Sequence, residues 1–293
     1  MRNRRTRWLA IPAAILTAAV LAGCTQDQMQ GWLPSTPGLT NHVDSVVGLW
    51  TTSWIVLLGV GIIVWFLMLW AAVVYRRRKG QVGLPAQLRY NMPIEIFFTT
   101  VPVILVLGFF AFTARDQAAI EQPIEDPDVQ ITVYGKRWAW DFVYERDGQD
   151  PVYYESIQAL NVPGSMEIDE DTIPTLYLPS NSAVELTLES RDVAHSFWIV
   201  EFLYKKDMLP GVTNYMYFET GDVEGVFTGK CAELCGEYHS MMLFNVEIVS
   251  PEEYQEYLDE LEAQGNVGHP DSDLDPLQPT WGPEGTENEE LGN

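Results

Sequence analysis

The chain has 293 residues, of which 47% are hydrophobic and 20% are charged, so it is long enough for one or two domains with a sizeable core. Its formal net charge is −24, and the excess is concentrated from Asp116 onward, where 38 acidic and 7 basic residues give −31. Such a region is expected to repel nucleic acid and to attract basic protein surfaces. Three cysteines, Cys24, Cys231 and Cys235, are too few for a disulfide scaffold.

The N-terminus has the pattern of an export signal. A basic segment at 2–7 is followed by an apolar segment at 8–20 and then by the letters L-A-G-C, which end at Cys24. The run resembles a bacterial lipobox, which predicts a signal peptide at 1–23, cleavage before Cys24 and lipid on the cysteine sulfur. The alternatives are an ordinary signal peptide or an uncleaved anchor, with Cys24 incidental.

Two apolar runs without charged residues follow a short segment at 24–45, which we expect to lie outside the cytoplasm. The run at 46–75 is long enough to cross a bilayer with room to tilt. The run at 96–114 is near the lower limit and contains Pro102, which a membrane helix tolerates. The loop between them is basic, and positive charge marks the cytoplasmic side. The sequence therefore predicts a transmembrane helical hairpin at 46–115, with both chain ends and the acidic region outside the cytoplasm.

Glu95 lies at the cytoplasmic start of the second apolar run. An ionisable side chain at a membrane span is costly unless it lies at the interface or has a function. The residues alone leave both interpretations open, a carboxylate at the membrane boundary or a functional group.

Beyond the second apolar run, the pattern changes to short alternating segments rich in aromatic and β-branched residues. Such segments predict an all-β sandwich or barrel at 116–250. The stretch at about 147–181 has weaker periodicity and is expected to be a long loop or insertion. A helix is predicted at 251–263 with Ser250 as its N-cap, and the acidic tail at 264–293 is expected to be disordered. The predicted strands lie at 129–144, 183–188, 195–200, 213–218 and 242–249.

The segment K-C-A-E-L-C-G-E-Y-H-S-M-M-L gathers soft donor groups from Cys231, Cys235, His239 and Met242. Thiolate, imidazole and thioether together suit copper rather than calcium or magnesium, and a closed zinc site would use four Cys or His ligands without a thioether. Because each thiolate can bridge two metal ions, two cysteines favour a binuclear site. Outside the cytoplasm the two cysteines would usually oxidise to a disulfide, unless bridging copper held them as thiolates.

Such a site needs a further terminal ligand, and the chain has four histidines. His42 precedes the first apolar run and His269 lies in the tail, which leaves His195 at the start of a predicted strand. A lone histidine there is more often a core residue, but a sheet could bring it beside the cysteine segment. We therefore expect His195 to join His239 as a ligand.

The motif C-A-E-L-C-G-E-Y-H-S-M-M matches C-x-E-x-C-G-x-x-H-x-x-M, and the chain resembles the copper-A subunit, subunit II, of cytochrome c oxidase from its first span to about Val249. The segments W-A-W, D-V-A-H-S-F and K-D-M-L-P-G support the resemblance. It implies a cupredoxin-like β domain and a binuclear copper centre, and the Glu233 side chain would also reach a magnesium or manganese ion shared with subunit I. The implied copper ligands are His195, Cys231, the backbone carbonyl of Glu233, Cys235, His239 and Met242.

Two further residues take roles from the resemblance. In the second span, E-x-x-x-T-x-x-P is matched by Glu95, Thr99 and Pro102, which implies that Glu95 lies at the mouth of a proton pathway. Trp138 matches the tryptophan through which electrons enter from cytochrome c, although a tryptophan in a β-strand is more commonly a core residue.

The chain departs from the family pattern in three places near the expected donor surface. Many members have G-x-Q-W-x-W, whereas this chain has Arg137 in place of the glutamine, and many have arginine after P-G, where Val212 stands here. The stretch at 147–181 is also longer than the usual loop. The overall resemblance is closest to oxidases of high-GC Gram-positive bacteria, in which the donor is a cytochrome c domain of the bc complex.

The resemblance implies a subunit of a respiratory oxidase and proton translocase in the bacterial cell membrane, with subunits I and III as partners. Electrons would pass from cytochrome c, or a cytochrome c domain, to the two coppers and on to haem in subunit I, where oxygen is reduced to water. The chain itself lacks membrane histidines for haem and has no C-x-x-C-H motif for covalent haem. The acidic exported region would steer a basic donor.

Three other functions fit less of the sequence. A quinol oxidase subunit II shares the fold but lacks the copper ligands. A copper chaperone of thioredoxin-like fold would have a helix, not a strand, after the cysteine pair. A lipid-anchored binding module with a disulfide between Cys231 and Cys235 would leave His195, His239 and Met242 without a role.

Overall fold

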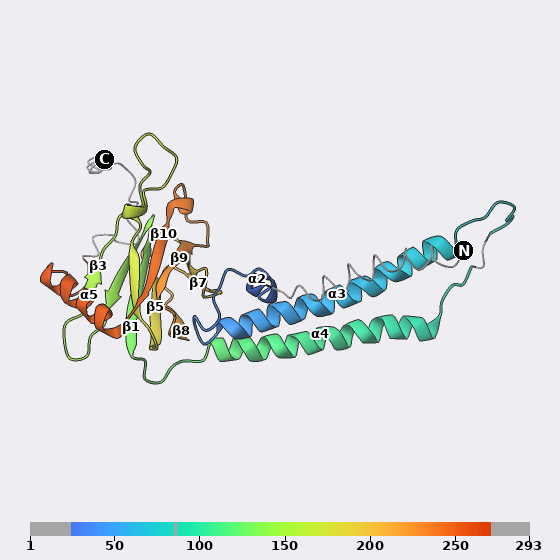
Figure 1. Ribbon diagram of the computed structural model, residues 1–293, viewed down its shortest axis with the longest axis horizontal. Coiled ribbons are helices and arrows are strands. Elements are labelled where there is room, and N and C mark those ends of the chain that lie inside the picture. The colour runs from blue at the N-terminus through green and yellow to red at the C-terminus, as the bar shows by residue number, and fades with distance from the viewer. Residues whose placement is uncertain (1–24, 85–86, 271–293) are drawn as a thin grey trace, which may run out of the picture. The chain divides into compact units, whose positions relative to one another are not determined.

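The computed structural model describes residues 25–84 and 87–270 (Figure 1). The predicted signal peptide at 1–23, the predicted lipidation site Cys24 and the tail from residue 271 lie outside the described residues. The chain divides into two compact units, of which one holds most of the two long apolar helices and the other holds the β-strands.

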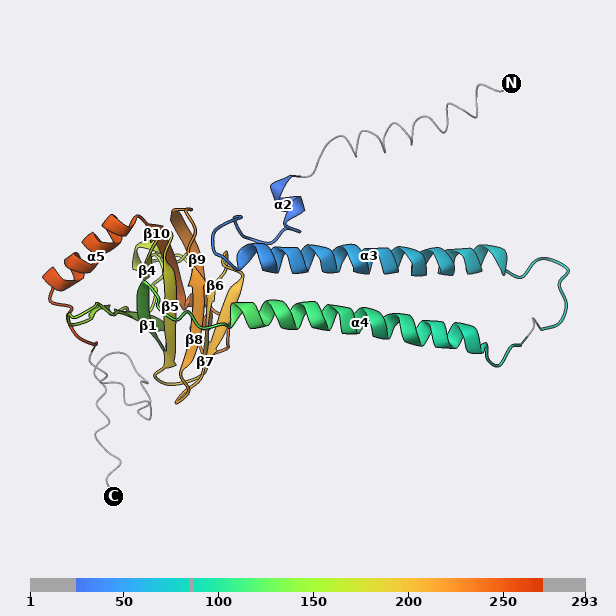
Figure 2. The same cartoon turned by 90° about the horizontal axis from the view of Figure 1, so that it is seen from below.

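The first unit is built on two long apolar helices, α3 (Val43–Val74) and α4 (Met92–Ile120), which follow the short helix α2 (Gln26–Met29). Both long helices have a length and composition that can cross a membrane, in agreement with the predicted hairpin. Each helix extends beyond its charge-free run, because helical hydrogen bonding does not require apolar side chains. Figure 2 shows α3 and α4 running in opposite directions.

The second unit is a sandwich of two five-stranded sheets, in agreement with the predicted all-β domain. Neighbouring strands are antiparallel, except for two parallel pairs described below. In spatial order, one sheet contains β3 (Val152–Tyr154), β2 (Ala139–Tyr144), β1 (Val129–Lys136), β5 (Ala183–Ser190) and β8 (Asn214–Glu219). The other contains β4 (Thr175–Pro179), β10 (Leu243–Val249), β9 (Gly225–Cys231), β6 (His195–Ile199) and β7 (Tyr204–Met208). The parallel pairs are β1 with β5 and β10 with β4.

The structure differs from the predicted strands in three respects. The single strand expected at 129–144 is a hairpin, because the chain turns at Arg137 and Trp138 and β1 pairs with β2. The interval 147–181, expected to be a long loop, contains β3 and β4. Two further strands were not predicted, since charged side chains in β7 and glycines in β9 obscure the alternating pattern.

An aromatic cluster fills the sandwich beside the cysteine segment. Trp140, Phe197 and Phe244 have no exposed surface. The rings of Phe197 and Phe244 stack with their centroids 4.3 Å apart, and Trp140 meets both edge-on. Gly229 of β9 leaves room for this cluster, because a Cβ there would lie 2.1 Å from the Phe244 ring. The cluster therefore fixes the positions of β6, β9 and β10, the strands that lead into the cysteine segment.

The helix predicted after the last strand is α5 (Pro251–Ala263), and it begins with a capping box. The Ser250 hydroxyl accepts from the Glu253 N–H, and the Glu253 carboxylate accepts from the Ser250 N–H. The helix packs onto β3 and β4. Its buried side chains are Tyr254, Leu258 and Leu261. After the helix, Val267 forms a bridge to Val152 of β3. The prediction of disorder from residue 264 is therefore wrong for residues 264–270, which return the chain to the sandwich.

Replacing Gly229 with alanine should lower the free energy of unfolding by about 1–3 kcal/mol, because the added methyl group forces the Phe244 ring to move within a filled core. Denaturant unfolding of the full chain, followed by tryptophan fluorescence, measures the change. Gly59→Ala is the control, since nothing lies within 4 Å of a Cβ at that position. If the Gly229→Ala protein is as stable as the unsubstituted chain, the Phe244 ring can move without cost and the prediction is wrong.

Candidate metal centre

Neighbouring strands of the second sheet bring the predicted donor residues together. β6 begins with His195, and Cys231 ends the antiparallel neighbour β9. The Cys231 N–H donates to the Met242 carbonyl over 3.0 Å, so the loop between β9 and β10 closes on itself. Cys235 lies within this loop, and His239 begins its 3₁₀ turn η2 (His239–Met241). The fold therefore gathers side chains from one strand end and one closed loop.

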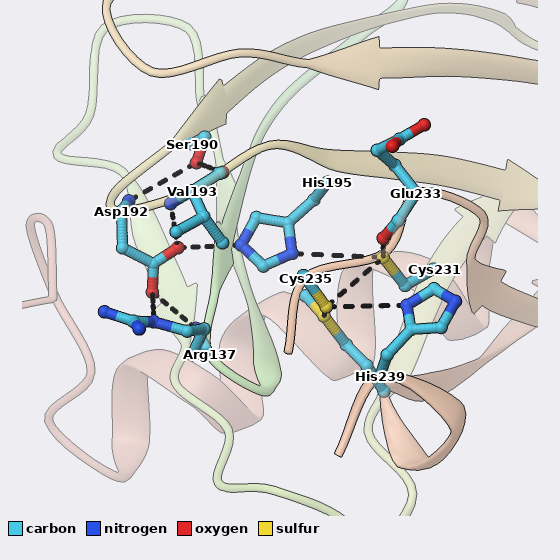
Figure 3. Close-up of polar contacts among 10 residues, drawn as sticks. Arg137, Ser190, Asp192, Val193, His195, Cys231, Glu233, Cys235 and His239 are labelled. Atoms are coloured by element: carbon cyan, nitrogen blue, oxygen red, sulfur yellow. Dashed lines mark hydrogen bonds and ion pairs between the residues drawn. The ribbon is translucent and has the colours of Figure 1, made fainter. Parts of the chain in front are cut away.

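The donor atoms of these residues lie close to one another (Figure 3). The two cysteine sulfurs are 3.8 Å apart. Cys231 Sγ lies 3.9 Å from His195 Nδ1, and Cys235 Sγ lies 3.5 Å from His239 Nδ1. Cys235 Sγ is also 3.7 Å from the Met242 Sδ. The ligand atoms of His195, Cys231 and Cys235, all buried, lie within 4.8 Å of one another, as a group that holds a metal ion requires.

The backbone carbonyl of Glu233 lies in the cysteine loop, whereas its side chain lies at the surface. Its carbonyl oxygen lies 3.2 Å from Cys231 Sγ. The side chain is exposed, and in Figure 3 its carboxylate points away from the cysteine sulfurs. The residue can therefore offer a carbonyl to the cysteine loop while its carboxylate stays accessible to a partner.

The two cysteines are free and buried. Their sulfur separation of 3.8 Å is well beyond the roughly 2.05 Å of a disulfide bond. The hydrogen bond from the Cys235 thiol, helped by His195, lowers the pKa of Cys231, while the adjacent Cys231 sulfur raises the pKa of Cys235. Cys231 therefore loses its proton readily. Cys235 keeps its proton until a cation compensates the second negative charge.

His195 is oriented by a carboxylate that the sequence prediction did not include. The imidazole is fully buried, and its Nε2 lies 2.7 Å from Asp192 Oδ1, which leaves Nδ1 facing the Cys231 sulfur. Although burial opposes ionisation, hydrogen bonds from His195, Val193 and Arg137 hold the pKa of Asp192 below its usual value. The sequence could have indicated this contact, because Asp192 lies three residues before His195 in the segment D-V-A-H.

Trp138 lies in the turn between β1 and β2 and is half-buried rather than fully exposed. Its ring meets Tyr238 edge-on, with centroids 4.9 Å apart. Gly236 lies against the indole, since a Cβ there would be 3.1 Å from it. The indole N–H has no partner among the described residues. Trp138 therefore packs against the backbone next to Cys235.

The other predicted residues are not in this cluster. Glu95 belongs to the first unit, in the first turn of α4, where its carboxylate accepts from the Asn91 N–H over 2.8 Å. That contact caps the start of the helix. His42 Nε2 lies 2.9 Å from the Tyr217 carbonyl oxygen, apart from the cysteine loop. Cys24 lies outside the described residues.

The donor set fits a soft transition metal. Thiolates, imidazoles and a thioether select copper over magnesium or calcium, which prefer oxygen ligands. The arrangement also has two similar halves, since each of the two adjacent sulfurs has its own imidazole. A single closed zinc site would need neither the thioether nor the second half. The donor set is therefore suited to copper.

Comparison with known proteins gives consistent matches. A family model described as cytochrome C oxidase subunit II, periplasmic domain, matches residues 129–249. A probable cytochrome c oxidase subunit 2 of Streptomyces avermitilis is 39% identical over 291 residues, which cover 92% of this chain and 91% of that protein. Cytochrome c oxidase subunit 2 of Mycobacterium tuberculosis is 33% identical over 298 residues, covering 87% of this chain and 82% of that protein. The periplasmic domain of subunit II of the cytochrome oxidase of Bradyrhizobium japonicum, a crystal structure, is 24% identical, with a TM-score of 0.40, and covers 48% of this chain and 99% of its own.

Mild oxidation of the metal-free chain should join Cys231 and Cys235, because the sulfurs need only close from 3.8 Å to about 2.05 Å. Thiol titration of the denatured chain should then show two fewer thiols, and a reductant should restore them. Cys231→Ser is the control, in which the Cys235 thiol should survive the oxidant. Survival of both thiols in the unsubstituted chain would show that the loop holds the sulfurs apart.

Proposed function

Because this chain belongs to the subunit II family of cytochrome c oxidases, we propose that it receives electrons at a binuclear copper centre and passes them to haem in subunit I. The observation that carries the proposal is the convergence of two thiols, two imidazoles and a thioether around one loop. In this assignment, reduction of oxygen to water and proton pumping belong to the rest of the complex. This chain supplies the route by which electrons reach it.

Six groups would hold the copper. They are the thiolates of Cys231 and Cys235, the imidazoles of His195 and His239, the Met242 thioether and the Glu233 carbonyl. Bound there, a copper pair would accept and release one electron shared over both nuclei. The burial of His195 and of both sulfurs keeps water out and holds the ligands in place. Small ligand movement between the two oxidation states favours rapid electron transfer.

The charge distribution supports a basic electron donor, either cytochrome c or a cytochrome c domain of the bc complex. From residue 116 onward, each basic side chain already has a partner. The pairs are Lys136 and Arg191 with Asp141, Arg137 with Asp192, Arg146 with Glu262, Lys205 with Asp207, Lys206 with Glu121, and Lys230 over the Trp198 ring. The surplus of carboxylates is therefore left to attract a basic surface.

The helices would place the chain in the bacterial cell membrane. We assign α3 and α4 as its spans, with the basic loop in the cytoplasm and both termini and the copper domain outside. Glu95 would then lie at the cytoplasmic end of α4, at the mouth of a proton pathway, and lipid on Cys24 would add an anchor. The apolar surfaces of the two helices, exposed in the chain alone, would contact subunits I and III. At the outer side, the Glu233 carboxylate would share a magnesium or manganese ion with subunit I.

The copper-loaded full chain should hold two copper ions, and its electron paramagnetic resonance spectrum should show one electron shared over both nuclei. Met242→Leu should change the hyperfine splitting, because the Met242 sulfur lies among the donors, 3.7 Å from Cys235 Sγ. Met241→Leu is the matched control and should leave the spectrum unchanged, since the Met241 sulfur contacts Gln158 instead.

Two results would contradict this assignment. One localised copper ion per chain, or no copper in a chain whose cysteines have oxidised, would exclude the binuclear centre. Identical spectra from Met242→Leu and Met241→Leu would remove the thioether from the ligand set.

Trp138→Phe should slow the bimolecular reduction of the copper centre by cytochrome c roughly tenfold, equivalent to about 1.4 kcal/mol of activation free energy. The reason is that the indole packs against the backbone beside Cys235. Stopped-flow spectroscopy at low ionic strength measures the rate, and the copper spectrum should stay unchanged. Trp198→Phe is the control, because that partly exposed indole lies under Lys230 instead. Equal rates in both variants would assign Trp138 to packing alone.

A further inference from the structure

Asp192 connects the candidate ligand His195 to Arg137 in the turn between β1 and β2 (Figure 3). The Asp192 side chain is 11% exposed. Its Oδ1 accepts from the Val193 N–H over 2.6 Å and from His195 Nε2 over 2.7 Å. Its Oδ2 accepts from the Arg137 backbone N–H over 2.7 Å and from Arg137 Nε over 3.4 Å. A carboxylate has about four acceptor positions, so those of Asp192 are all occupied.

The surroundings of His195 leave its ring one orientation. The side chain is fully buried, and Gly135 leaves it just enough room, since a Cβ at Gly135 would lie 3.2 Å from the ring. An ionised Asp192 can only accept, so we assign the ring proton to Nε2. Nδ1 is then the lone pair that faces Cys231 and is available to a metal. A carboxylate behind a metal-binding histidine generally sets the basicity of that ligand.

Arg137 alters what this carboxylate does to the histidine. The guanidinium side chain is 15% exposed, so water screens its charge poorly. A cation at Oδ2 draws electron density from the carboxylate and weakens its pull on the proton of His195. His195 then has less imidazolate character and donates less electron density to the metal. A weaker donor favours the reduced metal, which has the lower charge, over the oxidised metal.

We propose that Arg137 is a positioning residue that raises the reduction potential of the metal centre by acting through Asp192 on His195. This inference rests on the proposed copper site. It gives a role to the arginine that stands where many members of the family have glutamine. A glutamine would keep the backbone N–H for Asp192 but would supply no charge. The turn between β1 and β2 therefore carries two residues with different roles. Arg137 acts on the metal centre through Asp192, and Trp138 lies next to it in the chain.

The test is a double-mutant cycle on the copper-loaded full chain, with the reduction potential read by redox titration of its absorption. Arg137→Gln should lower the equilibrium constant for reduction roughly tenfold, which is about 59 mV for one electron. In an Asp192→Asn background, the same substitution should change the potential little, because the connecting carboxylate is gone. Arg146→Gln is the matched control, since it removes the same charge from an ion pair with Glu262.

The outcomes separate this inference from the copper assignment. Equal shifts with and without Asp192→Asn would overturn it, because Arg137 would then act by its charge through space alone. An unchanged potential in Arg137→Gln would overturn it as well. Failure of the unsubstituted chain to hold two copper ions would instead refute the proposed function, and copper analysis of that chain reveals this before any variant is compared.

A second measurement needs no metal and covers a glutamine variant that does not fold. Nitrogen NMR of the metal-free chain should show the His195 proton on Nε2. Arg137→Lys keeps the charge but not the planar guanidinium, so it should move this resonance, and by less than Arg137→Gln does if that variant folds. A His195 resonance that responds to neither substitution would overturn the connection between Arg137 and the ring.

Discussion

The site depends on one constraint, the close approach of two ionisable sulfur groups in a buried place. Cys231 and Cys235 lie 3.8 Å apart, where two thiolates would repel each other strongly without a cation between or beside them. The backbone imposes this approach, since β9 pairs with β10 and the Cys231 N–H closes the loop on the Met242 carbonyl. The histidines, the thioether and the carbonyl are then arranged around a pair of sulfurs that the fold has already placed. The need for a compensating cation is thus a property of the strand pairing as much as of the donor side chains.

The residue types and spacing in the cysteine segment were enough to predict its donor groups, because soft-ligand chemistry is visible in the sequence itself. His195 could be added because few histidines compete with it. The contact between Arg137 and Asp192 could not be predicted, since it joins a turn and a loop that are 55 residues apart in the chain. β4 was missed although its residues T-L-Y-L alternate in burial, because the acidic stretch before it led us to assign the whole interval to one loop. The half-buried state of Trp138 likewise depends on Gly236 and Tyr238, which only the folded loop brings to it.

The β domain has a large excess of negative charge in total, but its buried charges are paired locally. Over the whole region the surplus of carboxylates is large, yet beside β1 and β2 two carboxylates, Asp141 and Glu155, meet two cations, Lys136 and Arg191. Asp141 is fully buried and contacts Lys136 at 2.8 Å and Arg191 at 3.1 Å. Burial raises the pKa of Asp141, and the two cations oppose that effect. The domain can therefore have a strongly negative total charge while its buried carboxylate Asp141 is compensated by neighbouring cations.

The pairing of β6 with β9 brings together two candidate donors that lie far apart in the chain. Bringing His195 beside Cys231 closes a span of 36 residues, and the entropy of that closure is offset by the sheet rather than by metal binding. A zinc finger, in contrast, folds only when its metal binds. Here two five-stranded sheets with a filled core hold the strand ends that carry His195 and Cys231, so backbone pairing sets the spacing of these donors.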